Sequence, residues 1–310
     1  MRIKAALSGL LAATTATLAS TAVWAQDAIQ GLEVVGRPTD GEMGFQPAGT
    51  ELARDLQGLD HLILVIITVI TAFVVGLMAF AILRYNRRAN PNPSTFTHNT
   101  PIEVAWTIIP IVILVFIGAF SLPVLFKQQE IPEADITIKV TGYQWYWGYE
   151  YVDHGFGFDS YLLGHPATLG DGDDNVTPFV KDAEMVAKLE RAGYSKDDWL
   201  LATDTAVVIP VGKTVVMNVT GADVIHSWAI PAFGVKQDAV PGRIAQLWFK
   251  AEREGVYFGQ CSELCGKDHA YMPITVKVVS EEVYQQWLDG AIEEYAGTPR
   301  ASTVQVASAN

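Results

Sequence analysis

The sequence predicts a two-helix transmembrane hairpin followed by an all-β sandwich or barrel. Two long apolar runs, residues 62–83 and 102–126, lie close together in the first half of the chain. Beyond residue 135 the pattern changes to short β-rich segments separated by turn residues, as in sandwiches and barrels. Half of the 310 residues are hydrophobic and only 18% are charged, which is typical of a protein that lies partly in lipid.

The first 25 residues have the pattern of a secretory signal peptide. Arg2 and Lys4 form a basic start, an apolar stretch follows, and residues 23–25 match a small-x-small cleavage site imperfectly. An uncleaved membrane helix is the alternative, but the stretch is weakly hydrophobic and rich in Thr, Ser and Ala. We expect cleavage after Ala25, and then a polar, extended periplasmic segment over residues 26–58 that lies on a partner or in solvent.

The hairpin is expected over residues 59–128. Its first apolar run has 22 residues without a charge, long enough to span a bilayer. The second begins with Glu103 and contains Pro110, which a membrane helix tolerates when its neighbours satisfy the freed carbonyl. The link between the runs has three basic residues and no acidic one: Arg84, Arg87 and Arg88. The positive-inside rule places this link in the cytoplasm. We therefore expect a bacterial inner-membrane protein with two spans and with both termini and the β domain in the periplasm.

Residues 129–280 are expected to form the β domain. Residues 136–140 alternate with period two, as a half-buried strand does. The other predicted strands cover residues 206–210, 214–219, 227–230, 245–251, 255–260 and 274–279.

An insertion is expected between strands over residues 164–195. It starts with a solvated acidic turn at residues 171–174 and is helix-like from 181 to 192. After the β domain, Ser280 and the two glutamates that follow it predict the start of a helix. This helix lies in a segment, residues 281–310, whose small polar tail is expected to be disordered.

A segment of twelve residues combines the donor atoms that copper prefers. Cys261, Cys265, His269 and Met272 offer two thiolates, an imidazole and a thioether, the soft ligands typical of copper electron-transfer sites. His226 lies 35 residues upstream at the end of a predicted strand, and a β-sandwich could bring it beside this loop. A mononuclear blue-copper site needs only one cysteine, so the second cysteine favours two copper ions bridged by two thiolates.

A disulfide and a structural zinc site are the alternatives for this cysteine pair. The cysteines are the only two in a chain that is expected to reach an oxidising compartment. A disulfide between residues four apart would, however, restrict the unfolded chain very little. Zinc rarely binds methionine, and its usual ligand spacings differ. Copper is therefore the favoured ligand.

The loop, the aromatic run GYQWYWGYEY at residues 142–151 and the hairpin together resemble subunit II of the haem–copper cytochrome c oxidases. The resemblance runs from about residue 45 to residue 285, interrupted by the insertion. It implies a cupredoxin-like Greek-key barrel that holds two copper ions as the dinuclear CuA centre. The implied ligands are His226, Cys261, Glu263 (through its backbone carbonyl), Cys265, His269 and Met272. Each histidine would bind one copper, and both cysteines would bridge the pair.

The resemblance also implies the reaction and further sites. Electrons would pass from cytochrome c to CuA and then to haem and copper in subunit I, where O2 is reduced to water and protons are pumped. Trp145 would be the point where electrons enter. The Glu263 carboxylate would reach a magnesium or manganese ion shared with subunit I. Glu103 would lie at the mouth of a proton path, or it could simply be favourable at a helix N-terminus.

The acidic charge of the β domain indicates a basic partner. Nineteen acidic and twelve basic residues lie between Asp135 and Lys277, a net charge of −7. Such an excess steers a basic protein into a fast, weak encounter, and cytochrome c is such a partner. The expected docking residues, placed by position against the family, are Glu150, Asp159, Asp204 and Asp223. Subunit I, subunit III and membrane lipid are the other expected partners, with no nucleic acid among them.

Three rival functions fit the sequence less well. Quinol-oxidase relatives of this family lack the copper ligands, and all of them are present here. A nitrous oxide reductase would require a long additional catalytic domain and no membrane hairpin. A free-standing copper carrier would leave the hairpin and the acidic face around Trp145 unexplained. A Cys-x-x-Cys-His haem-attachment motif is also absent from the sequence, which implies a separate cytochrome.

Overall fold

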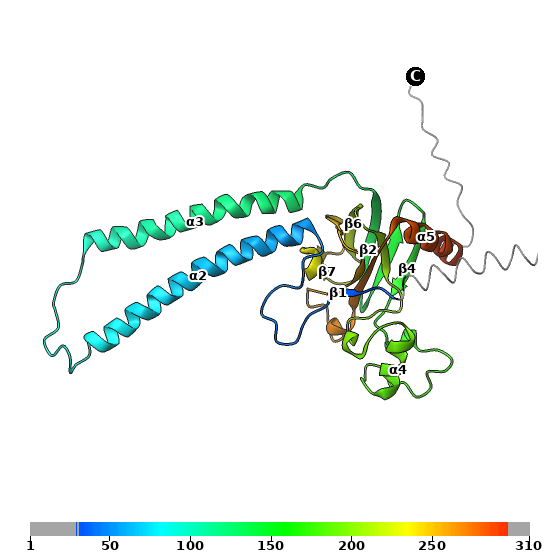
Figure 1. Ribbon diagram of the computed structural model, residues 1–310, viewed down its shortest axis with the longest axis horizontal. Helices are drawn as coiled ribbons and strands as arrows, with labels where there is room; N and C mark the ends of the chain where they lie inside the picture. Colours follow the sequence, from blue (N-terminus) through cyan, green and yellow to red (C-terminus); the bar gives the residue numbers. More distant parts are fainter. Residues whose placement is uncertain (1–28, 30, 297–310) are drawn as a thin grey trace, which may run out of the picture. The chain divides into compact units, whose positions relative to one another are not determined.

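The computed structural model describes residue 29 and residues 31–296 (Figure 1). The chain divides into two compact units, a helical hairpin over residues 54–130 and a β domain formed by the rest. The predicted signal peptide over residues 1–25 and the end of the predicted tail lie outside the described residues.

The hairpin consists of two helices that are long and apolar enough to cross a membrane, α2 (Glu51–Arg84) and α3 (Thr100–Gln129). Both predicted spans are present: α2 begins 11 residues before its predicted apolar run and ends one residue after it, and α3 begins two residues before its run and ends three after it. The Asn99 side chain caps α3 by accepting a hydrogen bond from the Ile102 amide. Lys127 of α3 pairs with Asp55 of α2 at 2.6 Å.

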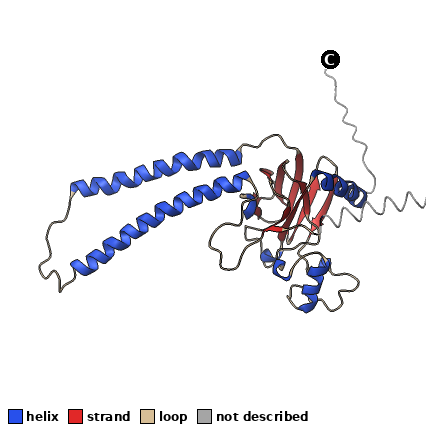
Figure 2. Ribbon diagram, viewed as in Figure 1, coloured by secondary structure: helices blue, strands red, loops and turns tan. Residues whose placement is uncertain are grey.

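The β domain contains two sheets and a separate two-stranded hairpin (Figure 2). In the five-stranded sheet the order is β4 (Phe156–Ser160), β3 (Tyr146–Tyr151), β2 (Ile136–Tyr143), β6 (Thr214–Gly221) and β9 (Ala245–Lys250). In the four-stranded sheet it is β1 (Val34–Gly36), β10 (Gly255–Gln260), β11 (Pro273–Val279) and β5 (Val207–Pro210). The hairpin pairs β7 (His226–Ile230) with β8 (Val235–Ala239). One apolar core joins side chains from both sheets, as expected for a sandwich.

Each predicted strand is present to within a few residues, but four strands escaped prediction: β1, β3, β4 and β8. The segment of residues 26–58 was expected only to be extended on a partner or in solvent. Within it, β1 instead pairs with β10 of its own domain, and α2 begins at Glu51. A three-residue strand whose partner lies more than 200 residues away leaves no periodic signal of its own in the sequence.

The predicted insertion folds around α4 (Ala183–Arg191), which Asp182 caps, and a short 3₁₀ turn, η1 (Pro166–Thr168). A second 3₁₀ turn, η2 (Lys196–Asp198), directly follows the insertion. The expected solvated turn at residues 171–174 is only partly solvated. The side chain of Asp173 is 11% exposed and pairs with Lys188 at 2.7 Å and with Arg191 at 3.0 Å. This turn is therefore fixed to α4.

The predicted C-terminal helix is α5 (Glu281–Ala296). The Ser280 hydroxyl accepts a hydrogen bond from the Val283 amide, as the predicted cap requires. Trp287 of α5 packs near the ring of Tyr151, with 5.4 Å between the ring centroids, and the helix contacts β4 and β5, the edge strands of the two sheets (Figure 1).

Candidate metal centre

The copper-type loop spans residues 261–272 between two paired strands. Cys261 directly follows β10 and Met272 directly precedes β11, and the strand ends Gln260 and Pro273 face each other in the ladder. The loop is thus closed at its base by the sheet. Both cysteine side chains are buried and free, with 3.8 Å between their sulfur atoms. A disulfide needs about 2 Å between the sulfurs, so the pair is two thiols.

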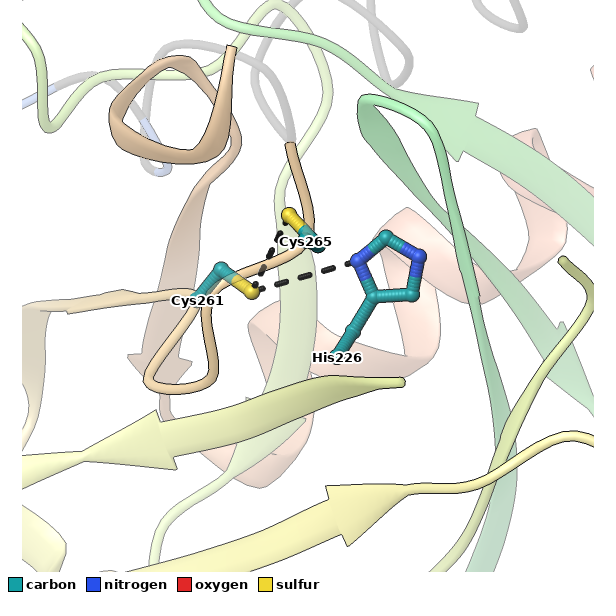
Figure 3. Close-up of side chains that lie close together, drawn as sticks. All are labelled: His226, Cys261 and Cys265. Atoms are coloured by element: carbon teal, nitrogen blue, oxygen red, sulfur yellow. Dashed lines mark hydrogen bonds between the residues drawn. The ribbon is translucent and has the colours of Figure 1, made fainter. Parts of the chain in front are cut away.

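His226 faces the two cysteines from the start of β7 (Figure 3). Its Nδ1 lies 3.9 Å from the Cys261 sulfur, and one donor atom from each of the three residues falls within 4.8 Å of the others. The imidazole is fully buried and lies against Gly142 of β2. A Cβ at Gly142 would come within 2.8 Å of the ring, so only glycine leaves room for this histidine.

The remaining predicted ligands complete the cluster from within the loop. The Cys265 sulfur lies 3.5 Å from Nδ1 of His269 and 3.5 Å from the Met272 sulfur. The Cys261 thiol donates to the backbone carbonyl of Glu263 at 3.3 Å. Two thiols, two imidazole nitrogens, a thioether and a carbonyl oxygen are thus linked by close contacts, and the sulfur and imidazole donors among them fit copper.

The two thiols differ in acidity. Burial raises the pKa of the Cys261 thiol, but hydrogen bonding with His226 and with backbone groups outweighs burial and holds the pKa below its ordinary value. Burial and the neighbouring Cys261 charge raise the pKa of Cys265 to about 12. Cys261 is therefore the first thiolate to form, and a metal that binds both sulfurs must displace a proton from Cys265.

Asp223 orients His226 from behind the cluster. Its carboxylate lies 2.9 Å from His226 Nε2 and also accepts hydrogen bonds from the backbone amides of Gln144 and Val224. A carboxylate behind a metal-binding histidine fixes the ring orientation and its tautomer. From the sequence, only a docking role is predicted for Asp223. Its position three residues before His226 is the signal that could have revealed this contact.

Trp145, at the turn between β2 and β3, lies directly on the copper-type loop. Its indole is half-buried and donates to the Cys265 carbonyl at 3.3 Å. The Lys267 ammonium lies 4.8 Å from the ring centroid. Gly266 permits the close approach, because a Cβ there would lie 3.0 Å from the indole. The predicted point of electron entrance is therefore in contact with Cys265, one of the predicted ligands.

The other acidic residues predicted to have roles lie outside the cluster. Glu150 is exposed and pairs with Lys139 at 3.3 Å. Asp159 is exposed on β4, and its charge helps to raise the pKa of Asp204, although burial is the larger cause. Asp204 also accepts a hydrogen bond from the Tyr161 amide at 2.8 Å. Glu103 belongs to the hairpin unit, where its carboxylate accepts a hydrogen bond from the Asn99 amide at 3.0 Å.

Comparisons with known proteins match nearly the whole chain to one family. Two family models match: the periplasmic domain of cytochrome c oxidase subunit II over residues 136–279, and its transmembrane domain over residues 38–124. Cytochrome c oxidase subunit 2 of Cereibacter sphaeroides is 61% identical over 291 residues, which cover 94% of this chain and 93% of the relative. A probable cytochrome c oxidase subunit 2 of Rickettsia bellii is 43% identical and covers 81% and 84% of the two chains.

One solved structure is similar to part of the chain. The periplasmic domain of subunit II of the cytochrome oxidase of Bradyrhizobium japonicum is 42% identical and covers 53% of this chain and 99% of that one, with a TM-score of 0.41.

Proposed function

The chain belongs to the family of cytochrome c oxidase subunit II, and we propose that its own side chains hold the dinuclear copper centre through which this family transfers electrons. The chain is a membrane-anchored subunit of an oxidase complex. The close contacts of the Cys261 and Cys265 thiols carry the proposal. The two sulfur atoms contact each other, two imidazole nitrogens, the Met272 thioether and the Glu263 carbonyl.

The proposed ligands are His226, Cys261, Glu263 through its carbonyl, Cys265, His269 and Met272. When bound, the copper pair supplies a one-electron couple whose charge is shared over two metals. The protein contributes a rigid frame: β10 and β11 close the loop at its base, and Asp223 holds His226 in one orientation. A rigid frame keeps the change in ligand geometry small when the oxidation state changes, which favours fast electron transfer.

Electrons are proposed to enter from cytochrome c at Trp145. The half-buried indole is bonded to the carbonyl of Cys265, so a short path of one hydrogen bond and one residue links the ring to a ligand sulfur. The acidic docking residues are proposed to be Glu150, Asp159, Asp204 and Asp223. Asp159 carries most of this proposal, since it is exposed, whereas Glu150 pairs with Lys139 and the Asp204 carboxylate accepts hydrogen bonds from backbone amides.

Several finer assignments rest on the family alone. We propose that the exposed Glu263 carboxylate binds a magnesium or manganese ion shared with subunit I, and that Glu103 lies at the mouth of a proton path. Subunit III is a further proposed partner. A periplasmic β domain, a cleaved signal peptide and the domain limits at residues 25, 58, 128 and 280 are proposed on the sequence pattern.

Rapid mixing of the assembled oxidase with reduced cytochrome c tests the proposed function. The Cys265→Ser variant should retain the haem spectrum of the complex but lose rapid electron input from cytochrome c. Val152→Ser, at an exposed turn position of the same domain, is the matched control and should behave like the parent. Undiminished input in Cys265→Ser would contradict the proposal.

A further inference from the structure

The insertion of residues 164–195 is anchored at its base to the strand that follows the copper loop. Leu162, just before the insertion, and Thr203, eight residues after it, form a β-bridge that brings the flanking chain segments together. The Thr275 hydroxyl of β11 accepts from the Thr203 amide and donates to the Leu201 carbonyl, both at 3.2 Å. Thr275 lies three residues beyond Met272, so the base of the insertion is fixed close to the end of the ligand loop.

A second set of contacts fixes the insertion to the strand that precedes the loop. Tyr194 packs beside Phe258 of β10 with 6.3 Å between the ring centroids, and the Lys277 ammonium of β11 lies 5.4 Å from the same tyrosine ring. Asp198, which follows the insertion, pairs with Arg37 next to β1 at 3.2 Å. The insertion is thus held to both strands that close the copper loop.

From this anchored position the insertion reaches the loop itself. The Phe179 ring meets the Tyr271 ring edge-to-face with 5.0 Å between the centroids. The His165 ring also contacts the Phe179 ring, with 5.5 Å between the centroids, and lies 5.0 Å from the Tyr161 ring centroid. Tyr271 ends the short turn η4 (His269–Tyr271), so this contact falls between the two proposed ligands His269 and Met272.

The backbone at Phe179 has an unusual conformation. Its φ is +60°, in the left-handed region that residues other than glycine seldom occupy. Its amide donates to the Gly164 carbonyl at 3.1 Å. Conformations of this kind persist only where the surrounding structure holds them, and they concentrate at functional positions.

We propose that Phe179 is a positioning residue for the copper centre and that the insertion acts as a clamp on η4. Within the loop, the backbone of this turn is held by two local hydrogen bonds: the His269 amide to the Gly266 carbonyl at 3.3 Å, and the Tyr271 amide to the Asp268 carbonyl at 2.9 Å. The clamp restricts the movement of His269 and Met272 from outside. This inference rests on the proposed copper function and gives the insertion a role in it.

The Phe179→Gly variant of the copper-loaded full chain tests the clamp. Glycine removes the ring and suits the left-handed backbone, so the variant loses the contact without adding strain. Loss of copper to an excess of chelator should become about two- to tenfold faster, the range expected for one aromatic pair. The hyperfine pattern in electron paramagnetic resonance should also broaden or shift. Phe179→Tyr should restore the parent values.

Two further variants keep the test specific. Leu200→Gly is the matched control, because Leu200 is the other non-glycine residue with left-handed φ among the described residues, at +67°. If Phe179 acts through the Tyr271 ring, Phe179→Gly should have no further effect in a chain that already carries Tyr271→Leu. Additive effects, or a Phe179→Gly variant that matches Leu200→Gly, would overturn the clamp alone. A parent chain without an electron shared over two coppers would overturn the proposed function as well.

Discussion

Nε2 of His226 lies 2.9 Å from the Asp223 carboxylate, and Nδ1 of the same ring faces the Cys261 sulfur at 3.9 Å. The carboxylate favours the tautomer with its proton on Nε2, which leaves the Nδ1 lone pair directed at the thiols. Asp223 is thus connected to the metal centre through His226, in addition to any part it has in docking.

Replacement of Asp223 by alanine should weaken copper binding. We expect a loss of affinity of about 10- to 100-fold, as is usual when the outer partner of a metal-binding histidine is removed. Asp223→Asn keeps a hydrogen-bond acceptor and should lose less. Competition with a chelator of known affinity measures both. If Asp223 acts only in docking, the affinity of Asp223→Ala for copper will equal that of the parent.

Electron input from cytochrome c should depend on ionic strength. The second-order rate should fall as salt rises, because exposed acidic residues steer the basic partner. Asp159→Asn should raise KM for cytochrome c more than Glu150→Gln does, since Glu150 already pairs with Lys139. A rate that is independent of salt would contradict electrostatic docking.

Copper uptake by the metal-free chain should release protons. The pKa of Cys265 is raised to about 12, so this thiol carries a proton at neutral pH that the metal must displace. The apparent affinity should therefore increase as pH rises from 6 to 8, and proton release into a weak buffer with an indicator dye measures it directly. Uptake without proton release would show that Cys265 stays protonated and is no ligand.

Lys277 should make the stability of the β domain depend on pH. Burial lowers its pKa to about 8, whereas the pKa of a lysine in the unfolded chain is about 10.4. Between these values the unfolded chain binds more protons, so the free energy of unfolding of the parent should rise with pH.

Lys277→Met has no such group and provides the comparison. Below pH 8, the Lys277→Met variant should have a higher free energy of unfolding than the parent. Above pH 8, this difference between the two chains should shrink by up to about 1.4 kcal/mol per pH unit. Denaturant unfolding of both chains at several pH values, followed by tryptophan fluorescence, measures this. A difference that stays constant from pH 7 to 10 would count against a buried lysine.

Much of the fold follows from local sequence patterns, and the exceptions have physical causes. The apolar runs and the alternating strand of residues 136–140 are periodic signals that tertiary contacts only extend. The short strand β1 and the polar strand β8 lack such a signal, since their pairing partners define them. Buried and more exposed residues do alternate along β3 and β4, so these two strands were within reach of the sequence pattern.

Five of the six proposed ligands could be named from the sequence because their side chains are of a kind that binds copper. The sixth, the Glu263 carbonyl, has no side-chain signal and was available only through the family resemblance. The contact of Phe179 with Tyr271 joins residues 92 positions apart through a left-handed backbone, and the sequence pattern offered no guide to it. Long-range contacts of this kind require the folded chain.

Electron paramagnetic resonance of the copper-loaded full chain, purified without its partner subunits, tests the central claim most directly. A seven-line hyperfine pattern is expected, because one electron is shared over two copper nuclei held by Cys261 and Cys265. Cys261→Ser and Cys265→Ser should each abolish this pattern. A four-line pattern in the parent chain would mean a single copper ion and would contradict the dinuclear centre.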